Sequence, residues 1–451
     1  MHHNIFSCLC LKRQRILLLF ICLTSALAAQ TGDTGLNSLV IKSMVDSLGN
    51  QLLRFYVSKD AAIKMNAFIH KRYDEGVYNR IEDPYVLAGL LNSDVNAVQK
   101  DEHFHVEYNP ALAAEVSGNI DDVPRMVAQK LAQEKARNYG FKRVEILNGN
   151  IGYLELSGFS RLNKYSKTAA DAAFRFLSGS RALIIDLRYG VGGSPDMVNY
   201  IAGKFFKGKT HIADIYIRSE NSTLPYWTSP DTAFASFHKM PVYILTSYKT
   251  FSAAEGLAYA LQKLKRATIV GEQTRGGAHT VTYKPIGAGF VCDIPFGVVM
   301  DPLSKANWER SGISPDIVCT AAAAPEVAQT EVFKQAIAAN TNKDEDATMR
   351  WQQRMMYAAN RPLNSSDTLN CRALTGVYGA NTVTFEGGTL YFQKAGMAKF
   401  AMVPMGDNYF RPLGNDTFLI GFAPKARLGG DDMVVYYDDG RTEGCQKKAK
   451  P

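Results

Sequence analysis

Ser252 stands where a serine side chain could act as a nucleophile. The apolar run VYILTS, residues 242–247, has the length of a buried strand, and SAAEGLAYALQKL, residues 252–264, has the spacing of an amphipathic helix. Ser252 therefore opens a predicted helix after a strand and a short turn. Its hydroxyl would lie in the positive field of the unpaired N–H groups of the first helical turn, which favours an alkoxide and a nearby oxyanion.

The same serine also fits a purely structural role. The run from Ser252 to Glu255 has the pattern of a capping box, in which both side chains accept hydrogen bonds from backbone N–H groups at the start of a helix. Helix caps are far commoner than nucleophiles, so this local pattern by itself favours a cap. A catalytic role requires a base and an oxyanion site elsewhere in the chain.

A glycine-rich loop follows another predicted strand. The run LIIDLR, residues 183–188, leads into Gly190, Gly192 and Gly193, and a helix follows. Glycines let backbone N–H groups approach a substrate closely, so this loop could stabilise a tetrahedral oxyanion. It could equally be a tight strand-to-helix turn. A dinucleotide site is not indicated, because the loop reads GVGGSP and lacks the G-x-G-x-x-G spacing.

A serine nucleophile needs a base, and histidine is a frequent one. Beyond the first thirty residues the candidates are His70, His103, His105, His211, His238 and His279. The alternating run HFHVEY, residues 103–108, predicts a strand with His103 and His105 on one face. A lone histidine on a strand is more often structural than catalytic, so the residue types alone leave the base open.

Seven segments, taken in order, resemble the tail-specific, or C-terminal processing, serine peptidases. The resemblance is nearest to the branch of interphotoreceptor retinoid-binding protein and the tricorn protease core, and it covers residues 36–320. The segments are a helical N-terminal stretch, DEH before a strand, NYGF with NGNIGYLEL, IIDLRYGVGGSPDM, TFSAAE, GEQTRGGA and GISPD. The resemblance implies an α/β fold with a crotonase-like ββα core.

The resemblance also assigns roles to individual residues. Ser252 matches the nucleophile, His103 the general base, and Glu309, within WERSGISPD, the charge-relay glutamate. The backbone N–H groups of Gly193 and Ala253 match the oxyanion hole. The implied chemistry is acyl transfer through an acyl-enzyme on the serine.

Other assignments remain open at several of these positions. Gly192 is a neighbouring candidate for the oxyanion hole, His105 is the rival base, and His279 is a more distant one. The processing branch uses a Ser–Lys dyad, but its lysine position falls within Gly276-Gly277-Ala278 here, which favours a Ser–His–Glu set. Residues 106–150 are too few for the PDZ domain of that branch, so substrate capture by a PDZ domain is not expected.

Hydrophobic periodicity divides the chain into five predicted parts. Helical spacing alternates with apolar strands in the middle of the chain, which predicts a mostly parallel sheet, and short strands separated by glycine turns follow near the end. The parts are a signal peptide (1–28), an N-terminal helical bundle (33–100), a catalytic domain (101–323), a helical connector (324–362) and a small C-terminal all-β domain (363–451).

The first residues predict export. Lys12, Arg13 and Arg15 precede the short apolar run ILLLFICLTSALA, and Ala26-Leu27-Ala28 forms a small-residue cleavage site. We therefore expect a periplasmic or extracellular protein; an uncleaved anchor is the alternative. No later segment gives eighteen uncharged apolar residues, so no further membrane span is expected.

Composition excludes several other classes. Of 451 residues, 46% are hydrophobic and 21% charged, as in ordinary globular proteins. Without residues 1–28 the formal net charge falls from +8 to +5. Apart from a short basic tail at Lys447, Lys448 and Lys450 it is spread along the chain, so no nucleic-acid partner is expected. No cysteine or histidine spacing indicates a metal, and no cofactor is expected. In an oxidising compartment the sequence-local disulfide pairing would be Cys292–Cys319 and Cys371–Cys445.

Three functions fit these observations. The first is an exported serine peptidase that cleaves unfolded proteins or peptides. The second is a catalytically silent binder of small hydrophobic ligands, such as retinoids or fatty acids, on the same fold. The third is an acyl-transfer enzyme that acts on a non-peptide ester. The intact set of Ser252, His103 and Glu309 with the glycine loop favours the peptidase. The cleavage preference and the oligomeric state stay open.

Overall fold

The computed structural model describes most of the chain. Residues 36–118, 123–229, 231–340, 349–353, 355–356, 371–405, 408–415, 417–422 and 432–448 are described, with 123–127 as backbone only. The predicted signal peptide and most of the predicted connector beyond residue 340 lie outside these residues. Within the described part, no helix has both the length and the apolar character that a membrane crossing requires.

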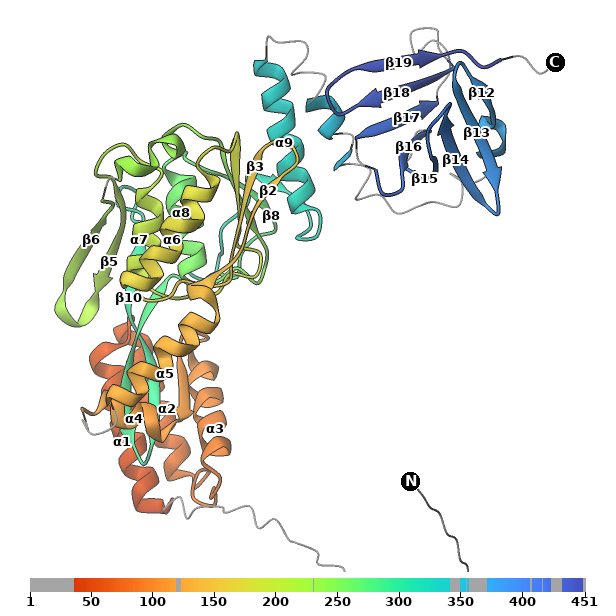
Figure 1. The fold of residues 1–451 in the computed structure, drawn as a ribbon. Coiled ribbons are helices and arrows are strands. Elements are labelled where there is room, and N and C mark those ends of the chain that lie inside the picture. Colours follow the sequence, from red (N-terminus) through yellow and green to blue (C-terminus); the bar gives the residue numbers. More distant parts are fainter. Residues whose placement is uncertain are drawn as a thin grey trace, which may run out of the picture.

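Three helices form one end of the molecule (Figure 1). The polar side chain just before each helix accepts hydrogen bonds from the backbone of the first turn, which fixes where the helix begins; these residues are Asn37, Ser58 and Asp83. Their apolar faces pack together and against strands of a nearby sheet, as the helical spacing predicts. The helices are α1 (Ser38–Phe55), α2 (Lys59–Asp74) and α3 (Pro84–Val98).

A six-stranded sheet forms the centre of the molecule. The strand order is β11-β8-β7-β4-β3-β2, and all neighbours are parallel except the β2–β3 pair. This confirms the predicted mostly parallel sheet. The strands are β2 (Phe141–Leu147), β3 (Ile151–Leu156), β4 (Ala182–Asp186), β7 (Val242–Thr246), β8 (Thr268–Gly271) and β11 (Ile317–Val318).

Helices cover both faces of this sheet, which explains why β4 and β7 are buried along their whole length. One face carries three helices that share a large apolar core, and the other face packs against a fourth helix. The three helices are α6 (Lys164–Leu177), α7 (Pro195–Gly203) and α8 (Ala253–Lys263), and the fourth is α9 (Ala324–Ala339).

A five-stranded antiparallel sheet joins the N-terminal helices to the centre. The long strand β10 pairs with β1, β5 and β9, and β6 extends the sheet beyond β5. The helices α4 (Pro110–Val116) and α5 (Val123–Ala136) follow β1. Of the five strands of this sheet, the sequence predicted only β1. The strands are β1 (His105–Tyr108), β5 (His211–Ile217), β6 (Ser222–Trp227), β9 (His279–Gly287) and β10 (Phe290–Met300).

One prediction about this sheet is wrong. The strand β1 begins at His105, and His103 lies in the turn before it, so the two histidines do not share a strand face. The hydrogen bond from the backbone N–H of Phe104 to the carbonyl of Asp101 closes this turn. The alternation HFHVEY therefore describes a strand only in its second half.

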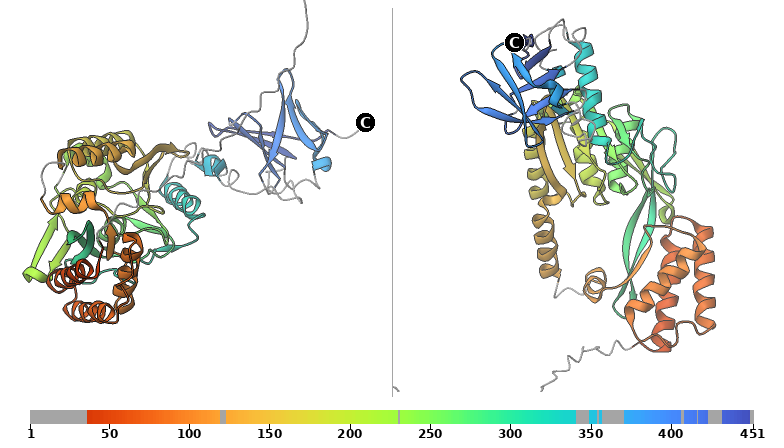
Figure 2. Two further views of the ribbon diagram at one scale, coloured as in Figure 1. Left: turned by 90° about the horizontal axis from the view of Figure 1, so that it is seen from below. Right: turned by 90° about the vertical axis from the view of Figure 1, so that its right-hand side faces the viewer.

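Eight strands form a barrel at the C-terminal end, at the far end of the molecule from the N-terminal helices (Figures 1 and 2). Each strand pairs antiparallel with the next, and a bridge between Tyr378 and Lys447 nearly closes the barrel. The all-β prediction is confirmed in these strands, although β16 and β19 were not predicted. The strands are β12 (Gly376–Tyr378), β13 (Asn381–Glu386), β14 (Thr389–Lys394), β15 (Lys399–Pro404), β16 (Tyr409–Pro412), β17 (Phe418–Phe422), β18 (Met433–Tyr437) and β19 (Thr442–Cys445).

The expected disulfide between Cys292 and Cys319 is wrong, because the two thiols lie in different cores of the fold. Cys292 is buried in β10 among the N-terminal helices, whereas Cys319 follows β11 in the central sheet. Sequence proximity therefore did not bring these two thiols together. Cys371 and Cys445 are both buried in the core of the C-terminal barrel. The expected pairing of Cys371 with Cys445 stays a prediction. The exact boundaries of the five parts into which the sequence divides the chain also stay predictions.

Candidate active site

Ser252 lies in the turn between β7 and α8, at the carboxyl end of the central strands. The hydroxyl of Thr250 donates to the carbonyl of Leu187 at 2.8 Å, and the backbone N–H of Phe251 donates to the carbonyl of Gly190 at 3.1 Å. These bonds hold the loop after β7 against the loop after β4. Such a junction, outside the carboxyl ends of parallel strands, is where α/β sheets bind ligands.

The backbone of Ser252 is strained. Its φ of 54° lies in the left-handed region, which costs a non-glycine residue roughly 1–3 kcal/mol. Its N–H donates to Glu255 Oε2 at 2.8 Å, and Glu255 also accepts hydrogen bonds from Thr274, Gly276 and Gly277. Burial raises the pKa of Glu255, although these hydrogen bonds oppose the rise. Glu255 thus anchors the turn and the loop after β8 together.

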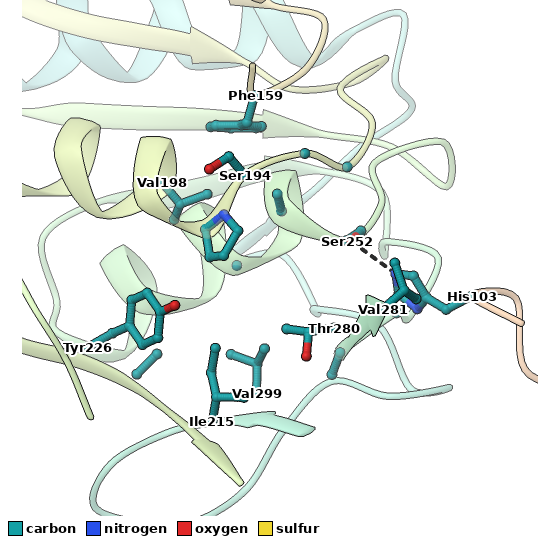
Figure 3. Close-up of a pocket in the computed structure, with 18 of the residues that line it drawn as sticks. His103, Phe159, Ser194, Val198, Ile215, Tyr226, Ser252, Thr280, Val281 and Val299 are labelled. Carbon is teal, nitrogen blue, oxygen red and sulfur yellow. Dashed lines mark hydrogen bonds between the residues drawn. The ribbon is translucent and has the colours of Figure 1, made fainter. Parts of the chain in front are cut away.

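The hydroxyl of Ser252 faces His103, and the Oγ–Nε2 distance is 2.9 Å (Figure 3). The imidazole stacks on Phe251 with ring centroids 4.6 Å apart. Burial lowers the pKa of His103 to about 4, and the nearby charge of Asp101 only partly offsets this. His103 is therefore neutral at pH 7 and able to accept a proton from the serine. The structure brings the predicted nucleophile and the predicted base into contact.

The rival bases do not contact Ser252. The side chain of His105 is exposed on β1. His279, the first residue of β9, is hydrogen-bonded through Nδ1 to Asp101, and its ring centroid lies 6.4 Å from that of His103. The geometry therefore favours His103 as the base among the three histidines that the sequence left open.

Glu309 does not take the position expected of a relay. Its Oε2 accepts the backbone N–H of Ala278 at 2.7 Å and lies 3.7 Å from Nδ1 of His279. The Nδ1 atom of His103 is buried and has no hydrogen-bond partner among the described residues. The predicted direct contact between Glu309 and His103 is therefore not present, because the N–H of Ala278 and the ring of His279 hold the carboxylate elsewhere.

The glycine loop lies directly beside Ser252. A Cβ atom on Gly192 would lie 3.2 Å from Ser252 Oγ, and one on Gly193 would meet the carbonyl of Phe159. The bond from the N–H of Ser194 to that carbonyl, at 2.7 Å, fixes the loop. Within the described part of the chain, the N–H groups of Gly193 and Ala253 have no acceptor. Both residues line the cavity at Ser252, where two free donors could bind a substrate carbonyl oxygen.

A cavity of about 680 Å³ opens at Ser252 and His103 (Figure 3). Most of its wall is apolar. Charged side chains line it as well, from α5 and the loop after β3: Lys130, Glu134 and Arg161. The apolar lining includes Phe159, Val198, Ile215, Tyr226, Tyr259, Val299 and Trp308. Such a cavity suits a large apolar group next to the reacting bond.

Three residues around the site had no assigned role in the sequence. Phe251 stacks on His103, and Gly277 lies against the rings of these two residues. The indole N–H of Trp308 donates to the carbonyl of Gly277 at 2.8 Å. Phe251 and Gly277 fall within the motifs TFSAAE and GEQTRGGA, and Trp308 within WERSGISPD. The motifs therefore indicated the positions, but only the structure gives their contacts.

Gly277→Ala is expected to displace the imidazole. A Cβ atom there would lie 2.6 Å from Cε1 of His103 and would also meet the ring of Phe251. Misplacement of a reacting group by about 1 Å can cost on the order of 10²-fold in rate, so we expect a kcat lower by about that factor. Gly179→Ala is the matched control, because nothing lies within 4 Å of the added methyl group. Equal kcat values for both variants would contradict the placement of His103.

Two family models match the chain. The model "Peptidase family S41" matches residues 150–319, and the model "N-terminal domain of Peptidase S41 in eukaryotic IRBP" matches residues 38–144. The two segments contain Ser252 and His103, respectively. Glu309 also falls within the first of these matches.

Individual relatives cover smaller parts. The carboxy-terminal-processing protease of Bartonella bacilliformis is 28% identical over 201 residues, which are 43% of this chain and 42% of that protein. The chloroplastic C-terminal processing peptidase of Tetradesmus obliquus is 31% identical over 192 residues, 40% of this chain and 37% of that protein. The chain thus spans about two fifths of these relatives. The crystal structure of the tricorn protease aligns with 70% of this chain and 37% of its own, at 13% identity and a TM-score of 0.42.

Proposed function

The chain belongs to peptidase family S41, a family of serine-type peptidases, and from this premise we propose that it hydrolyses peptide bonds in unfolded proteins or peptides. The observation that carries the proposal is the 2.9 Å contact between Ser252 Oγ and His103 Nε2 at the mouth of a cavity. A serine and a base in this contact form the essential pair of a serine hydrolase.

The proposed reaction passes through an acyl-enzyme. Ser252 Oγ attacks the scissile carbonyl carbon while Nε2 of His103 takes its proton. The N–H groups of Gly193 and Ala253 stabilise the oxyanion, and the positive end of α8 adds to their field. The C–N bond breaks as His103 returns the proton to the leaving amine. Water then transfers a proton to His103 and attacks the acyl carbon. The bond from that carbon to Ser252 Oγ breaks as His103 returns the proton to Oγ, which releases the carboxylic acid product and restores Ser252.

The apolar wall of the cavity supports a preference for substrates with an apolar side chain next to the cleaved bond. Each buried methylene group is worth about 0.8 kcal/mol, so a phenylalanine-sized group gains a few kcal/mol over alanine in such a pocket. We propose that unfolded segments are the substrates, because apolar side chains are accessible there and buried in folded proteins. The crotonase-like core implied by the sequence resemblance is part of the same proposal.

Val299→Asp tests the apolar pocket. Val299 lines the cavity from β10, and a carboxylate there disfavours an apolar side chain and favours a cationic one. We expect kcat/KM for peptides with Phe before the cut to fall by roughly 10²-fold, with a gain for Lys, in a peptide-panel assay. Val318→Asp is the matched control, since Val318 is 81% exposed on β11. An unchanged preference in Val299→Asp would contradict the assignment of this pocket.

Cleavage of unfolded casein, followed by mass spectrometry of the products, tests the proposed function itself. We expect new termini that follow apolar residues, with no added cofactor. A folded protein that leaves casein and an ester panel intact would overturn the peptidase proposal. Hydrolysis of esters alone would support an acyl-transfer enzyme on a non-peptide substrate.

The apolar cavity also favours a second candidate function. A catalytically silent protein could hold a retinoid or fatty acid in the same volume of about 680 Å³. A binder has no need for a strained Ser252 at hydrogen-bond distance from a buried histidine. Binding of a fluorescent fatty acid without any peptide cleavage would support this alternative.

We also propose that the protein is exported to the periplasm or the extracellular space. The support is the basic and apolar pattern of residues 1–28, which ends in a small-residue cleavage site. The expected mature chain begins at Ala29, and N-terminal sequencing of the secreted protein checks this. A chain that retains residues 1–28 would favour the uncleaved anchor.

A further inference from the structure

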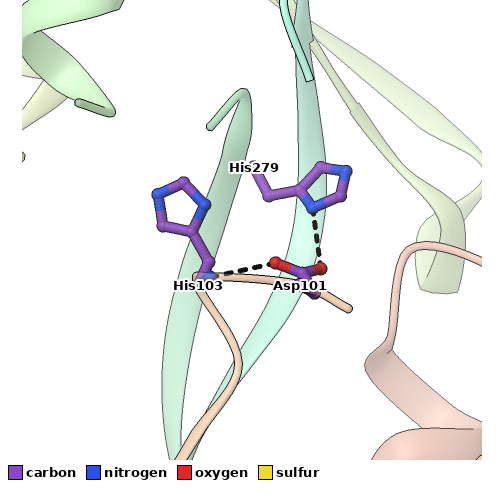
Figure 4. Close-up of side chains that lie close together, drawn as sticks. All are labelled: Asp101, His103 and His279. Carbon is purple, nitrogen blue, oxygen red and sulfur yellow. Dashed lines mark hydrogen bonds and ion pairs between the residues drawn. The ribbon is translucent and has the colours of Figure 1, made fainter. Parts of the chain in front are cut away.

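A buried carboxylate lies directly behind His103. Asp101 is only 2% exposed, and its Oδ1 accepts the backbone N–H of His103 at 3.0 Å. Its Oδ2 accepts the hydroxyl of Tyr56 at 2.9 Å and faces Nδ1 of His279 at 3.0 Å (Figure 4). Burial would raise the pKa of Asp101, but the interactions with His279, with the N–H of His103 and with Tyr56 outweigh it and lower this pKa. Asp101 is therefore ionised at neutral pH, and Nδ1 of His279 must be the donor.

One ring nitrogen of His103, on the side of Asp101, has no hydrogen-bond partner among the described residues. Nε2 contacts Ser252, whereas the buried Nδ1 makes no hydrogen bond to any described residue. One ring nitrogen of His103 points toward Asp101 and His279 (Figure 4). A ring nitrogen of each histidine and a carboxylate oxygen of Asp101 all lie within 4.8 Å of one another. When Nε2 accepts the serine proton, Nδ1–H carries part of the positive charge and needs an acceptor. Asp101 is the buried carboxylate on this side of the ring and is the candidate acceptor.

Among the charged groups around His103, Asp101 has the largest effect on the pKa of this histidine. Asp101 and Glu102 precede it in the same turn, His279 begins β9, and Arg275 lies in the loop after β8. Of these, Asp101 opposes the effect of burial on the pKa of His103 most strongly. Glu102 raises this pKa less, and Arg275, which pairs with Glu102, lowers it. Glu309 lies against the other side of the network, bound to the N–H of Ala278 and 3.7 Å from His279.

We propose that Asp101, and not Glu309, is the carboxylate that orients His103 and stabilises its imidazolium during acyl transfer. Tyr56 and His279 keep Asp101 in place, so the end of the first helix contributes to the site: Tyr56 is the C-cap residue of α1. Asp101 is a positioning residue, since it acts through His103 and does not contact the substrate. This inference rests on the proposed peptidase function.

Asp101→Asn and Glu309→Gln form the decisive pair of variants, because each keeps its shape and loses its charge. For Asp101→Asn we expect kcat to fall on the order of 10³-fold with little change in KM. We expect less than about tenfold for Glu309→Gln. Removal of a charge that raises the pKa of His103 must lower this pKa, so the acid limb of kcat/KM moves to lower pH in Asp101→Asn and stays in place in Glu309→Gln.

A second measurement does not depend on turnover. Nuclear magnetic resonance of histidine labelled at ¹³Cε1, with His103 assigned from the spectrum of His103→Gln, follows its titration directly. We expect a lower pKa of His103 in Asp101→Asn only. If Asp101→Asn does not fold, Tyr56→Phe replaces it, because it removes one of the two hydrogen bonds that hold Asp101 Oδ2 in place; a several-fold lower kcat at unchanged KM is then expected.

The outcomes separate the inference from its premise. If the wild-type protein is folded, with His103 titrating at its expected pKa of about 4, but is inactive, the proposed function is overturned, and the inference with it. An active wild type in which Glu309→Gln shows the larger loss of kcat, and Asp101→Asn leaves the titration of His103 unchanged, overturns the inference alone.

Discussion

Ser252→Ala is expected to lower kcat/KM for casein-derived peptides by roughly 10⁴–10⁶-fold, the range typical for loss of a serine nucleophile. The reason is chemical, because no other hydroxyl is hydrogen-bonded to His103 in the described part of the chain. The substitution keeps the Cβ atom and removes only Oγ. The N–H bond to Glu255, which anchors the turn, remains.

The stability of the fold should be nearly unchanged by this substitution. The thermal unfolding midpoint and the circular dichroism spectrum of Ser252→Ala are expected to match those of the wild type. Ser178→Ala is the matched control: its hydroxyl donates to the carbonyl of Arg175 at the end of α6, far from the site in sequence and exposed to solvent. Residual activity in Ser252→Ala within tenfold of the wild type would exclude this serine as the nucleophile.

His103→Ala is expected to cost kcat nearly as much, roughly 10⁴–10⁶-fold, because a triad member and its serine act as a unit. His105→Ala, two residues away, should stay within about threefold, since its side chain is exposed on β1. Steady-state kinetics on one peptide decide between them. Equal losses in the two variants would contradict the choice of His103.

The pH dependence follows from the pKa of His103, which burial lowers to about 4. The base works only when neutral, so kcat/KM of the wild type should rise through about pH 4 and then level off. The free energy of unfolding also falls as the pH falls. An unfolded histidine has a pKa of about 6.5, so the unfolded chain takes up the extra proton as the pH falls from there toward 4, and the fold is destabilised. His103→Ala should therefore lose less stability on acidification than the wild type.

Much of the central sheet could be predicted because its strands are continuous apolar runs between amphipathic helices, as in β4 and β7. The antiparallel sheet could not. Its strands β9 and β10 contain Pro285 and Pro295, which usually argue against a strand, and register shifts next to Pro295 accommodate one of them. In β6 the apolar alternation is weak, because this strand is mostly exposed.

The residues of the candidate site were predictable where a motif fixes them locally, and less so where contacts are distant. Ser252 and His103 lie 149 residues apart, and the family motifs identified both. The same motifs gave Glu309 a relay role, but that carboxylate is held by the N–H of Ala278. The contact of Asp101 with Tyr56 and His279 depends on how the N-terminal helices pack against the sheet, which no local pattern encodes.

Labelling with a fluorophosphonate tests the central claim, an activated Ser252, most directly. The probe reacts only with a serine whose proton a base can take, and mass spectrometry of the digested protein locates the adduct. We predict one adduct, on the peptide that contains Ser252, absent in Ser252→Ala and formed far more slowly in His103→Ala. A folded wild-type protein that stays unlabelled, or carries the adduct on another serine, would contradict it.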